Sequence, residues 1–253
     1  MSPPTTRSRR AAALVALAVA GSMFVPIGAA QAAPREQSPA ARQLTAPVTT
    51  GVVTTMNATA TQALAQPTLK QGARGTAVTN LQRRLVALHY DVGAVDGDFG
   101  PSTFHAVVAF QKVNGLGRDG VVGPKTWAAL SKPVVPKPRY KHSGLSLEAN
   151  LSKQVLYLAR NGQVIRILDA SSGKASTPTV RGNYKITRRI DGWRQSDLGL
   201  LWRPNYFYRG YAIHGATSVP AYPASHGCVR VTVPAMNRLW GTIKVGLPVH
   251  VYA

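Results

Sequence analysis

The chain has 253 residues, of which 30 are lysine or arginine and 9 are acidic, and its formal net charge is +21. The basic residues are not interleaved with aromatic residues as they are in a nucleic-acid-binding platform, so nucleic acid is not expected as a partner. Because Cys228 is the single cysteine, a disulfide within the chain is excluded.

The first 32 residues are typical of a signal peptide. Three arginines precede the uncharged apolar run 11–30, and Ala30-Gln31-Ala32 offers the small residues of a cleavage site. An uncleaved membrane anchor is the alternative. Cleavage would lower the net charge to +18, because it removes three arginines and no acid. For a protein exported to the cell wall or beyond it, anionic wall polymers are then possible partners, and a solvated basic surface is the alternative.

Two segments have the composition of linkers. Residues 33–66 consist mainly of Ala, Thr, Pro and Gln, with too little apolar surface to offset the entropy of ordering them, which predicts a flexible spacer. Residues 132–142 contain three prolines, which favour an extended and semi-rigid linker. Two segments remain as candidate domains, 67–131 and 143–253.

The segment 67–131 contains an internal repeat. DGDFGPSTFHA (residues 96–106) aligns with DGVVGPKTWAA (residues 119–129). Asp-Gly marks a tight turn, and Pro101 and Pro124 suit the first turn of a helix. Apolar residues recur at helical spacing before the first copy and between the copies, at Val78, Leu81, Leu85, Leu88, Phe104, Val107, Val108 and Phe110. The pattern predicts a small three-helix unit.

This unit resembles the small peptidoglycan-binding domain of bacterial wall hydrolases and related enzymes. The stretches that carry the resemblance are LKQGARGTAVTNLQRRL, VDGDFGPSTFHAVVAFQ and DGVVGPKTWAAL. The resemblance implies binding to the glycan or the stem peptides of peptidoglycan. The segment holds no acid/base pair and no nucleophile, so we expect it to be non-catalytic.

The segment 143–253 has the pattern of a mostly-β domain. The apolar runs 155–160 and 163–169 flank Asn161-Gly162, which is the signature of a type I′ hairpin turn. Further β-prone runs lie at 184–190, 206–213, 228–233 and 247–252, and one helix is expected at 234–240. A sandwich or barrel-like core is predicted.

The residues alone leave three interpretations of Cys228: an inert buried thiol, a partner in an intermolecular disulfide, or a nucleophile. Gly227 permits unusual backbone conformations, and the amides of Gly227 and Cys228 could converge on an oxyanion. A thiol with an ordinary pKa of about 8.5 needs a base near neutral pH. His214 and His226 are both candidates, and the residues themselves do not rank them.

The stretch IHGATSVPAYPASHGCVR resembles the signature of the L,D-transpeptidase catalytic domain of the YkuD type. LEANLSKQVLYLARNGQVIRILDASSGK and TPTVRGNYKI resemble other parts of the same domain. The resemblance implies that Cys228 is the nucleophile and His214 the general base, oriented by the carbonyl of Gly215. It further implies an oxyanion hole built by His226, Gly227 and Cys228, and it implies no cofactor and no metal.

Three further residues are expected to bind substrate. Arg230 lies two residues beyond Cys228 on a strand and would face the same way, so it could bind a carboxylate of the stem peptide. A structural ion pair is the alternative for Arg230. Ser225 and Tyr206 complete the set. The loop between His214 and Ser225 is shorter than in many members of the family.

The resemblance implies attack on a tetrapeptide stem, release of D-Ala and formation of 3→3 cross-links in peptidoglycan, with acylation by carbapenem-type inhibitors. Attack by water instead would make the protein an L,D-carboxypeptidase. Two alternatives come from other classes. One is a non-catalytic wall-binding protein. The other is a zinc peptidase that would use His214 and His226 as ligands, although the sequence offers no Asp or Glu ligand near them.

Overall fold

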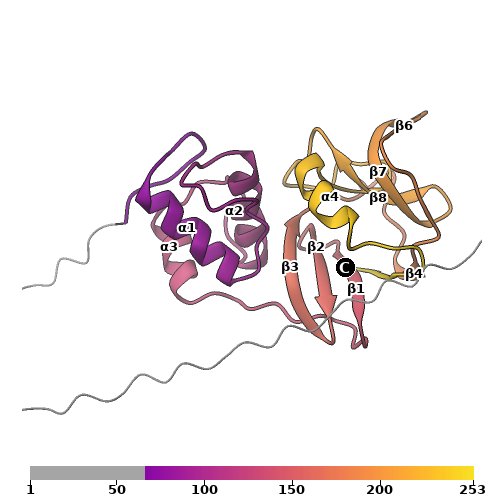
Figure 1. Cartoon of the computed structure of the whole chain (residues 1–253), viewed down its shortest axis with the longest axis horizontal. Coiled ribbons are helices and arrows are strands. Elements are labelled where there is room, and N and C mark those ends of the chain that lie inside the picture. Colours follow the sequence, from indigo (N-terminus) through magenta and orange to yellow (C-terminus); the bar gives the residue numbers. More distant parts are fainter. Residues whose placement is uncertain (1–65) are drawn as a thin grey trace, which may run out of the picture. The chain divides into compact units, whose positions relative to one another are not determined.

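The computed structural model describes residues 66–253 (Figure 1). The predicted signal peptide, 1–32, and the predicted spacer, 33–66, lie outside the described residues except for residue 66. Among the helices of residues 66–253, none is long and apolar enough to cross a membrane.

The predicted three-helix unit is confirmed within residues 66–131. Its helices are α1 (Thr76–Ala87), α2 (Pro101–Val113) and α3 (Pro124–Ser131). Helices α2 and α3 begin at the two prolines of the sequence repeat, where the missing N–H of proline is not needed. Six of the eight apolar residues at helical spacing are buried, with Leu81, Leu85 and Phe110 fully enclosed, and Leu88 and Phe104 are partly buried against the same cluster.

A buried glutamine holds each Asp-Gly turn of this unit. The side chain of Gln82 accepts hydrogen bonds from the amides of Asp96 (3.1 Å) and Gly97 (2.9 Å) and donates to the Asp96 carboxylate (2.8 Å). Gln111 repeats the arrangement. It accepts from the Gly120 amide (2.9 Å) and donates to the Asp119 carboxylate (2.7 Å). The glutamines stand 14 and 8 residues before their aspartates, so the sequence repeat does not reveal them.

Residues 145–252 form two sheets (Figure 1). The first sheet has the order β3-β2-β1-β10-β4, and β1 is parallel to β10. Its strands are β1 (Leu145–Asn150), β2 (Val155–Arg160), β3 (Gln163–Asp169), β4 (Gly182–Lys185) and β10 (Pro248–Tyr252). The second sheet has the order β5-β7-β8-β9, with β6 paired to β7 and β8 parallel to β9. Its strands are β5 (Arg188–Arg189), β6 (Trp193–Ser196), β7 (Gly199–Tyr208), β8 (Tyr211–Ala216) and β9 (Val229–Thr232).

The two sheets share one hydrophobic core, as expected for a sandwich. Leu147 and Leu156 of the first sheet pack in the same cluster as Phe207 and Val231 of the second. Helix α4 (Val233–Trp240) adds Met236 to this cluster and lies where the sequence predicted a helix. The predicted fold class, a helical unit with a mostly-β domain, is confirmed.

Two of the predicted β runs are divided in the structure. The hairpin at Asn161-Gly162 is confirmed, with φ values of 51° and 75°. The run 206–213 is instead the end of β7, a turn at Arg209-Gly210 and the start of β8. The run 184–190 splits because the chain changes sheets. The amide of Ile186 donates to Leu247 beside β10, whereas the next amide, of Thr187, donates to Tyr206 of β7. Apolar content alone does not show where a chain leaves one sheet for another.

Replacement of Gln111 by leucine should lower the free energy of unfolding by about 2 to 3 kcal/mol, because leucine leaves buried groups of the turn without partners. Urea unfolding of the two proteins measures the difference. Exposed Gln195 supplies the control, since Gln195→Ala should change the free energy by less than about 0.5 kcal/mol. A loss for Gln111→Leu as small as that of the control would show that the turn does not depend on the glutamine.

Candidate active site

A cleft of about 590 Å³ lies beside the second sheet. Its walls come from the β6–β7 hairpin, from β8 and from the loop that precedes β9. The structure brings six of the predicted site residues to it, namely Cys228, His214, His226, Arg230, Ser225 and Tyr206.

The parallel pairing of β8 with β9 places the two ends of the signature side by side. Ile213 is paired with Val229 and His214 with Arg230, so Cys228 directly precedes the paired stretch. Parallel strands need a crossover of about a dozen residues, and here the crossover is the loop 217–228. The loop therefore has about the minimum length that a parallel connection between β8 and β9 requires.

His214 is buried, and its hydrogen bond fixes the tautomer of its ring. Nδ1 lies 2.9 Å from the carbonyl oxygen of Gly215. A carbonyl oxygen only accepts, so Nδ1 carries the proton and Nε2 is the basic nitrogen of the neutral ring. Burial lowers the pKa of His214 to about 4; the charge of Arg230 acts in the same direction, and the bond to Gly215 opposes them. The imidazole is therefore neutral at neutral pH.

Gly215 has no room for a side chain. A Cβ at this position would lie 2.9 Å from the indole of Trp202 and 3.1 Å from Cβ of Met236. Because Trp202 and Met236 pack so closely against it, the backbone of Gly215 is held beside the imidazole. Its carbonyl lies where the resemblance placed the group that orients His214.

Cys228 carries a free and partly buried thiol. Its Sγ lies 3.8 Å from the carbonyl oxygen of Gly210, to which the thiol donates. Burial raises the pKa of the Cys228 thiol, and the charge of Arg230 opposes this in part. The neutral thiol is thus the resting form near neutral pH.

The turn before Cys228 has a tightly determined shape. Gly227 has φ of 116°, and a Cβ there would collide with the ring of Tyr211. The hydroxyl of Ser225 donates to the Cys228 carbonyl (2.5 Å) and accepts from the Gly227 amide (3.1 Å). Ser225 thus binds the turn itself, and the Gly227 amide is already engaged. Thr179, which the sequence did not single out, donates to the Gly227 carbonyl (2.7 Å).

The charge of the cleft is positive. Arg188, Arg194 and Arg230 line it together with one acidic residue, Asp197. Arg188 lies over the ring of Tyr206, with 4.1 Å between the guanidinium carbon and the ring centroid. Within residues 66–253, the guanidinium of Arg230 takes part in no ion pair, so the structure does not give it the structural partner that was the alternative.

The β6–β7 hairpin is the part of the site that the sequence did not predict. Trp193, Leu198 and Leu200 line the cleft and are exposed by 46%, 64% and 57%. Apolar side chains that stay exposed beside a cleft mark a surface for a ligand. The available signal was the turn sequence Ser196-Asp197-Leu198-Gly199, preceded by Trp193 and followed by the apolar run Leu200-Leu201-Trp202. In the described part of the chain, no three His, Cys, Asp or Glu side chains gather in an arrangement suited to a metal ion.

Two family models match the chain. The model described as the L,D-transpeptidase catalytic domain (YkuD) matches residues 145–251, and a putative peptidoglycan binding domain matches residues 74–130. The crystal structure of the L,D-transpeptidase (residues 123–326) from Xylanimonas cellulosilytica is 45% identical with a TM-score of 0.69. The alignment covers 73% of this chain and 97% of that one.

Curated relatives match over shorter stretches. A probable N-acetylmuramoyl-L-alanine amidase of Bacillus licheniformis is 46% identical over 65 residues, which are 25% of this chain and 18% of the amidase. The zinc D-Ala-D-Ala carboxypeptidase of Streptomyces albus G is 48% identical over 63 residues, 24% of each chain. This chain thus spans about a fifth to a quarter of the length of these two relatives.

The 45% identity to the Xylanimonas structure extends over nearly all of that chain, and the YkuD model covers the strands and the loop that form the cleft. The protein belongs to the L,D-transpeptidase family, with a YkuD-type catalytic domain preceded by a peptidoglycan-binding domain.

Proposed function

We propose that the protein is a cell-wall L,D-transpeptidase that forms 3→3 cross-links in peptidoglycan through an acyl-enzyme on Cys228. One observation carries the proposal. A neutral His214, whose basic Nε2 is left free by the Gly215 bond, lines the same cleft as the thiol of Cys228. A thiol and a neutral imidazole in one cleft are the groups that acyl transfer requires.

In the first step, Nε2 of His214 takes the proton of the Cys228 thiol, and Sγ attacks the carbonyl carbon between residue 3 of the donor stem and its terminal D-Ala. The carbonyl π electrons move to oxygen and then return as the C–N bond breaks. The nitrogen of D-Ala takes the proton from His214 and leaves. A thioester between Cys228 and the shortened stem remains.

In the second step, the side-chain amine of the diamino acid in a second stem attacks the thioester carbon. His214 accepts a proton from that amine, the C–S bond breaks, and the sulfur of Cys228 regains a proton. An amide now joins the two stems. Water in place of the amine would give a shortened tripeptide stem, the product of an L,D-carboxypeptidase.

The backbone around Cys228 supplies the oxyanion donors in this proposal. The resemblance names His226, Gly227 and Cys228 for this role. Since the Gly227 amide already donates to Ser225, we assign the developing charge chiefly to the amides of His226 and Cys228. Ser225 and Thr179 then act by holding the turn in which these amides lie.

The remaining surface of the cleft fits an anionic stem peptide. Arg230, near the thiol and without an ion-pair partner, is suited to a stem carboxylate, and Tyr206 with the exposed apolar side chains of the hairpin offers surface for the rest of the stem. The peptidoglycan-binding domain would hold the enzyme on its polymer. Reaction in the cell wall, after export, follows from this substrate.

The proposal is tested on purified protein with a disaccharide-tetrapeptide and, separately, with a carbapenem. Wild-type protein should gain one drug mass in intact-protein mass spectrometry and should convert the tetrapeptide to a dimer that lacks one D-Ala. The Cys228→Ser variant should do neither, because serine is a far weaker nucleophile without a stronger base. Ser131→Ala, a hydroxyl change at the end of α3, should behave as wild type.

Each other outcome is decisive. A tripeptide as the main product would replace transpeptidation by carboxypeptidation. No adduct and no product on wild type would contradict a nucleophilic Cys228 and favour a non-catalytic wall-binding protein. Product formation that stops in the presence of a strong chelator would favour a zinc peptidase.

The protonation states predict a pH dependence for alkylation of Cys228 by iodoacetamide. Burial raises the pKa of the thiol, so the thiolate fraction and the rate should still be rising above about pH 8.5, the ordinary thiol pKa. Because the pKa of His214 is lowered to about 4, no imidazolium is present near pH 6 to hold a thiolate. The rate measured against pH should therefore show no plateau between about pH 5 and 7.

The same single thiol in urea-unfolded protein is the control, and its rate should follow the ordinary pKa. A plateau that already begins near pH 6 in the folded protein would mean that Cys228 rests as a thiolate paired with imidazolium, contrary to the assignment made for His214.

Replacement of Arg230 by glutamine should lower kcat/KM for the tetrapeptide by about 10- to 100-fold, the loss expected for a charge-assisted hydrogen bond. Steady-state assays measure this loss. Arg160→Gln, at the exposed end of β2, should leave the value unchanged. Because the Arg230 charge also lowers the pKa of the Cys228 thiol, alkylation of both proteins by neutral iodoacetamide is measured in parallel, and kcat/KM should fall by a larger factor than the alkylation rate. An unchanged kcat/KM would remove Arg230 from the substrate site.

A further inference from the structure

The peptidoglycan-binding domain and the catalytic domain share a continuous buried contact. Val107, Phe110 and Val113 of α2 belong to the same hydrophobic cluster as Tyr157 and Ile167 of the first sheet. Backbone bonds reinforce the contact, because the Ile167 amide donates to His89 (2.8 Å) and the Asp91 amide donates to Ile167 (3.1 Å). Helix α2 thus packs on β3 as part of one core.

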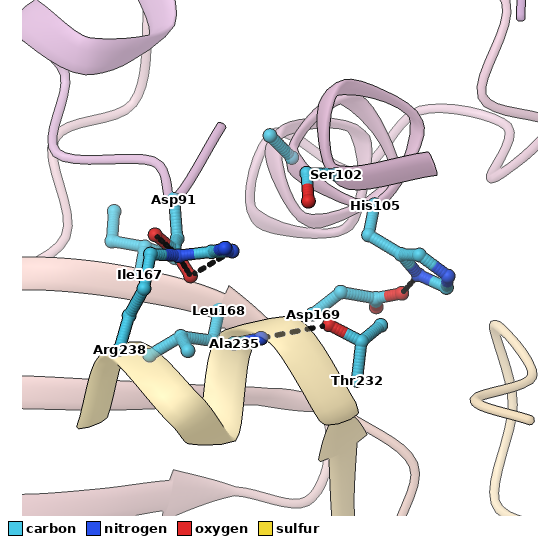
Figure 2. Close-up of a pocket in the computed structure, with 10 residues that line it drawn as sticks. Asp91, Ser102, His105, Ile167, Leu168, Asp169, Thr232, Ala235 and Arg238 are labelled. Carbon is cyan, nitrogen blue, oxygen red and sulfur yellow. Dashed lines mark hydrogen bonds and ion pairs between the residues drawn. The ribbon is translucent and has the colours of Figure 1, made fainter. Parts of the chain in front are cut away.

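Two groups of polar contacts lie across this core, on either side of a cavity of only about 10 Å³. Figure 2 shows Asp91 facing Arg238 of α4 on one side and His105 facing Asp169 on the other. The Arg238 guanidinium binds the Asp91 carboxylate through two nitrogens, at 2.9 Å each. The cavity is too small for a ligand, so the contact is closed.

Lys112 is the most deeply buried charged group of the contact. Its side chain is 0% exposed, and its ammonium donates to the Asp169 carboxylate (2.5 Å) and to the carbonyls of Ala170 (2.8 Å) and Gln154 (3.0 Å). His105 lies 2.6 Å from the other carboxylate oxygen of Asp169. All three ammonium protons are therefore directed at the catalytic domain, two of them at its main chain.

The main chain that Lys112 holds leads directly to the active site. Beyond Ala170, the amide of Ser171 donates to the carbonyl of Arg230 (3.0 Å), and the carbonyl of Ser171 accepts from the Arg230 amide (2.9 Å). The carbonyl of Ser172 accepts the amides of Ala224 and Ser225 (2.9 Å each). Gln154 fixes the same segment, since its amide side chain bonds both the hydroxyl and the amide of Ser172.

A second contact runs directly from the peptidoglycan-binding domain to the loop 217–228. Arg118, in the loop after α2, donates to the carbonyl of Ala221 (3.1 Å). The hydroxyl of Ser171 donates to the next carbonyl, of Tyr222 (2.7 Å). Among the residues that the structure describes, residues 217–224 form no hydrogen bond with one another, and those they do form go to Arg118, Ser171 and Ser172.

We propose that Lys112 and Arg118 of the peptidoglycan-binding domain are positioning residues for the reaction at Cys228. Lys112 fixes residues 169–172, on which the loop 217–228 rests, and Arg118 fixes the loop itself. The domain that binds the wall thereby also holds the nucleophile in place. The proposal rests on the proposed function for its kinetic readout, and its structural readout does not depend on that function.

Three variants test it. Lys112→Met/Asp169→Asn removes the ammonium and the carboxylate together, so that no buried charge is left without a partner. Arg118→Ala truncates an exposed side chain and should leave the thermal midpoint unchanged. Lys112→Met alone shows the cost of leaving Asp169 with His105 as its remaining partner. The matched controls are Asp91→Asn, which breaks the other ion pair of the contact, and Arg83→Ala, another exposed arginine of the same domain.

The double variant and Arg118→Ala should each slow acylation by a carbapenem by about 10- to 100-fold, as expected when a reacting group is misplaced by a fraction of an ångström to an ångström. With the tetrapeptide, kcat should fall while KM stays within about twofold, because the substrate-binding groups remain. Asp91→Asn should lower the thermal midpoint and keep the wild-type acylation rate. Arg83→Ala should change neither.

Wild-type acylation rates in the double variant and in Arg118→Ala, at a temperature where both are folded, would overturn the proposal. So would an equal loss in Asp91→Asn, since the effect would then be general loosening of the contact. If the wild-type protein shows no acylation at all, amide hydrogen exchange tests whether Lys112 and Arg118 hold the loop. The amides of Ala224 and Ser225 should exchange at least about tenfold faster in the variants than in the controls, and equal exchange would overturn the proposal.

Discussion

The parallel pairing of β8 with β9 is the interaction on which the active site depends. A parallel pair needs a crossover, and in this protein the crossover is itself the functional loop, residues 217–228. The pairing sets His214 opposite Arg230 and brings Cys228 to the end of the neighbouring strand. Gly215 permits the close packing of Trp202 and Met236 that holds the strand at this point. Shifting the register of the pairing by one residue would turn the imidazole to the opposite face of the sheet.

Burial gives the site its chemistry as well as its geometry. A buried imidazole loses its charge, which makes His214 a base at neutral pH, and the same burial keeps Cys228 protonated until the base acts. Arg230 contributes to both groups, because its charge disfavours the imidazolium and favours the thiolate. The pair is thus at rest as two neutral groups, and the charged state arises during the reaction, where the amides of the turn can stabilise it.

The first part of the loop that carries the nucleophile, residues 217–224, has no hydrogen bonds within itself; within residues 66–253, its bonds go to residues 171–172 and to Arg118. The last part, residues 225–228, is held by Ser225 and by bonds from Lys174, Thr177 and Thr179. Residues 171–172 are themselves fixed beside the buried Lys112–Asp169 pair. A charged pair so deeply buried gains little stability from its own attraction, because desolvation offsets it. The three hydrogen bonds of the Lys112 ammonium instead fix the position of α2 relative to residues 169–170 of the catalytic domain. The contact between the domains is thus connected to the active-site loop through residues 169–172 and through Arg118.

Much of this protein could be read from its sequence, because the signals are local. The repeat with its Asp-Gly turns and helix-starting prolines predicted α2 and α3, and apolar residues at helical spacing before it predicted α1. Asn161-Gly162 predicted the first hairpin, and SHGC with an upstream IHG predicted cleft residues. Other features depend on residues far apart in the chain. The sheet change at Ile186, the glutamines behind the turns and the burial of Lys112 beside Asp169 have no local signal, because each is defined by a partner that only folding brings near. The sequence by itself determined the local elements and the reactive groups. Only the tertiary structure decided their protonation and their support, since both arise from burial and from contacts between distant segments.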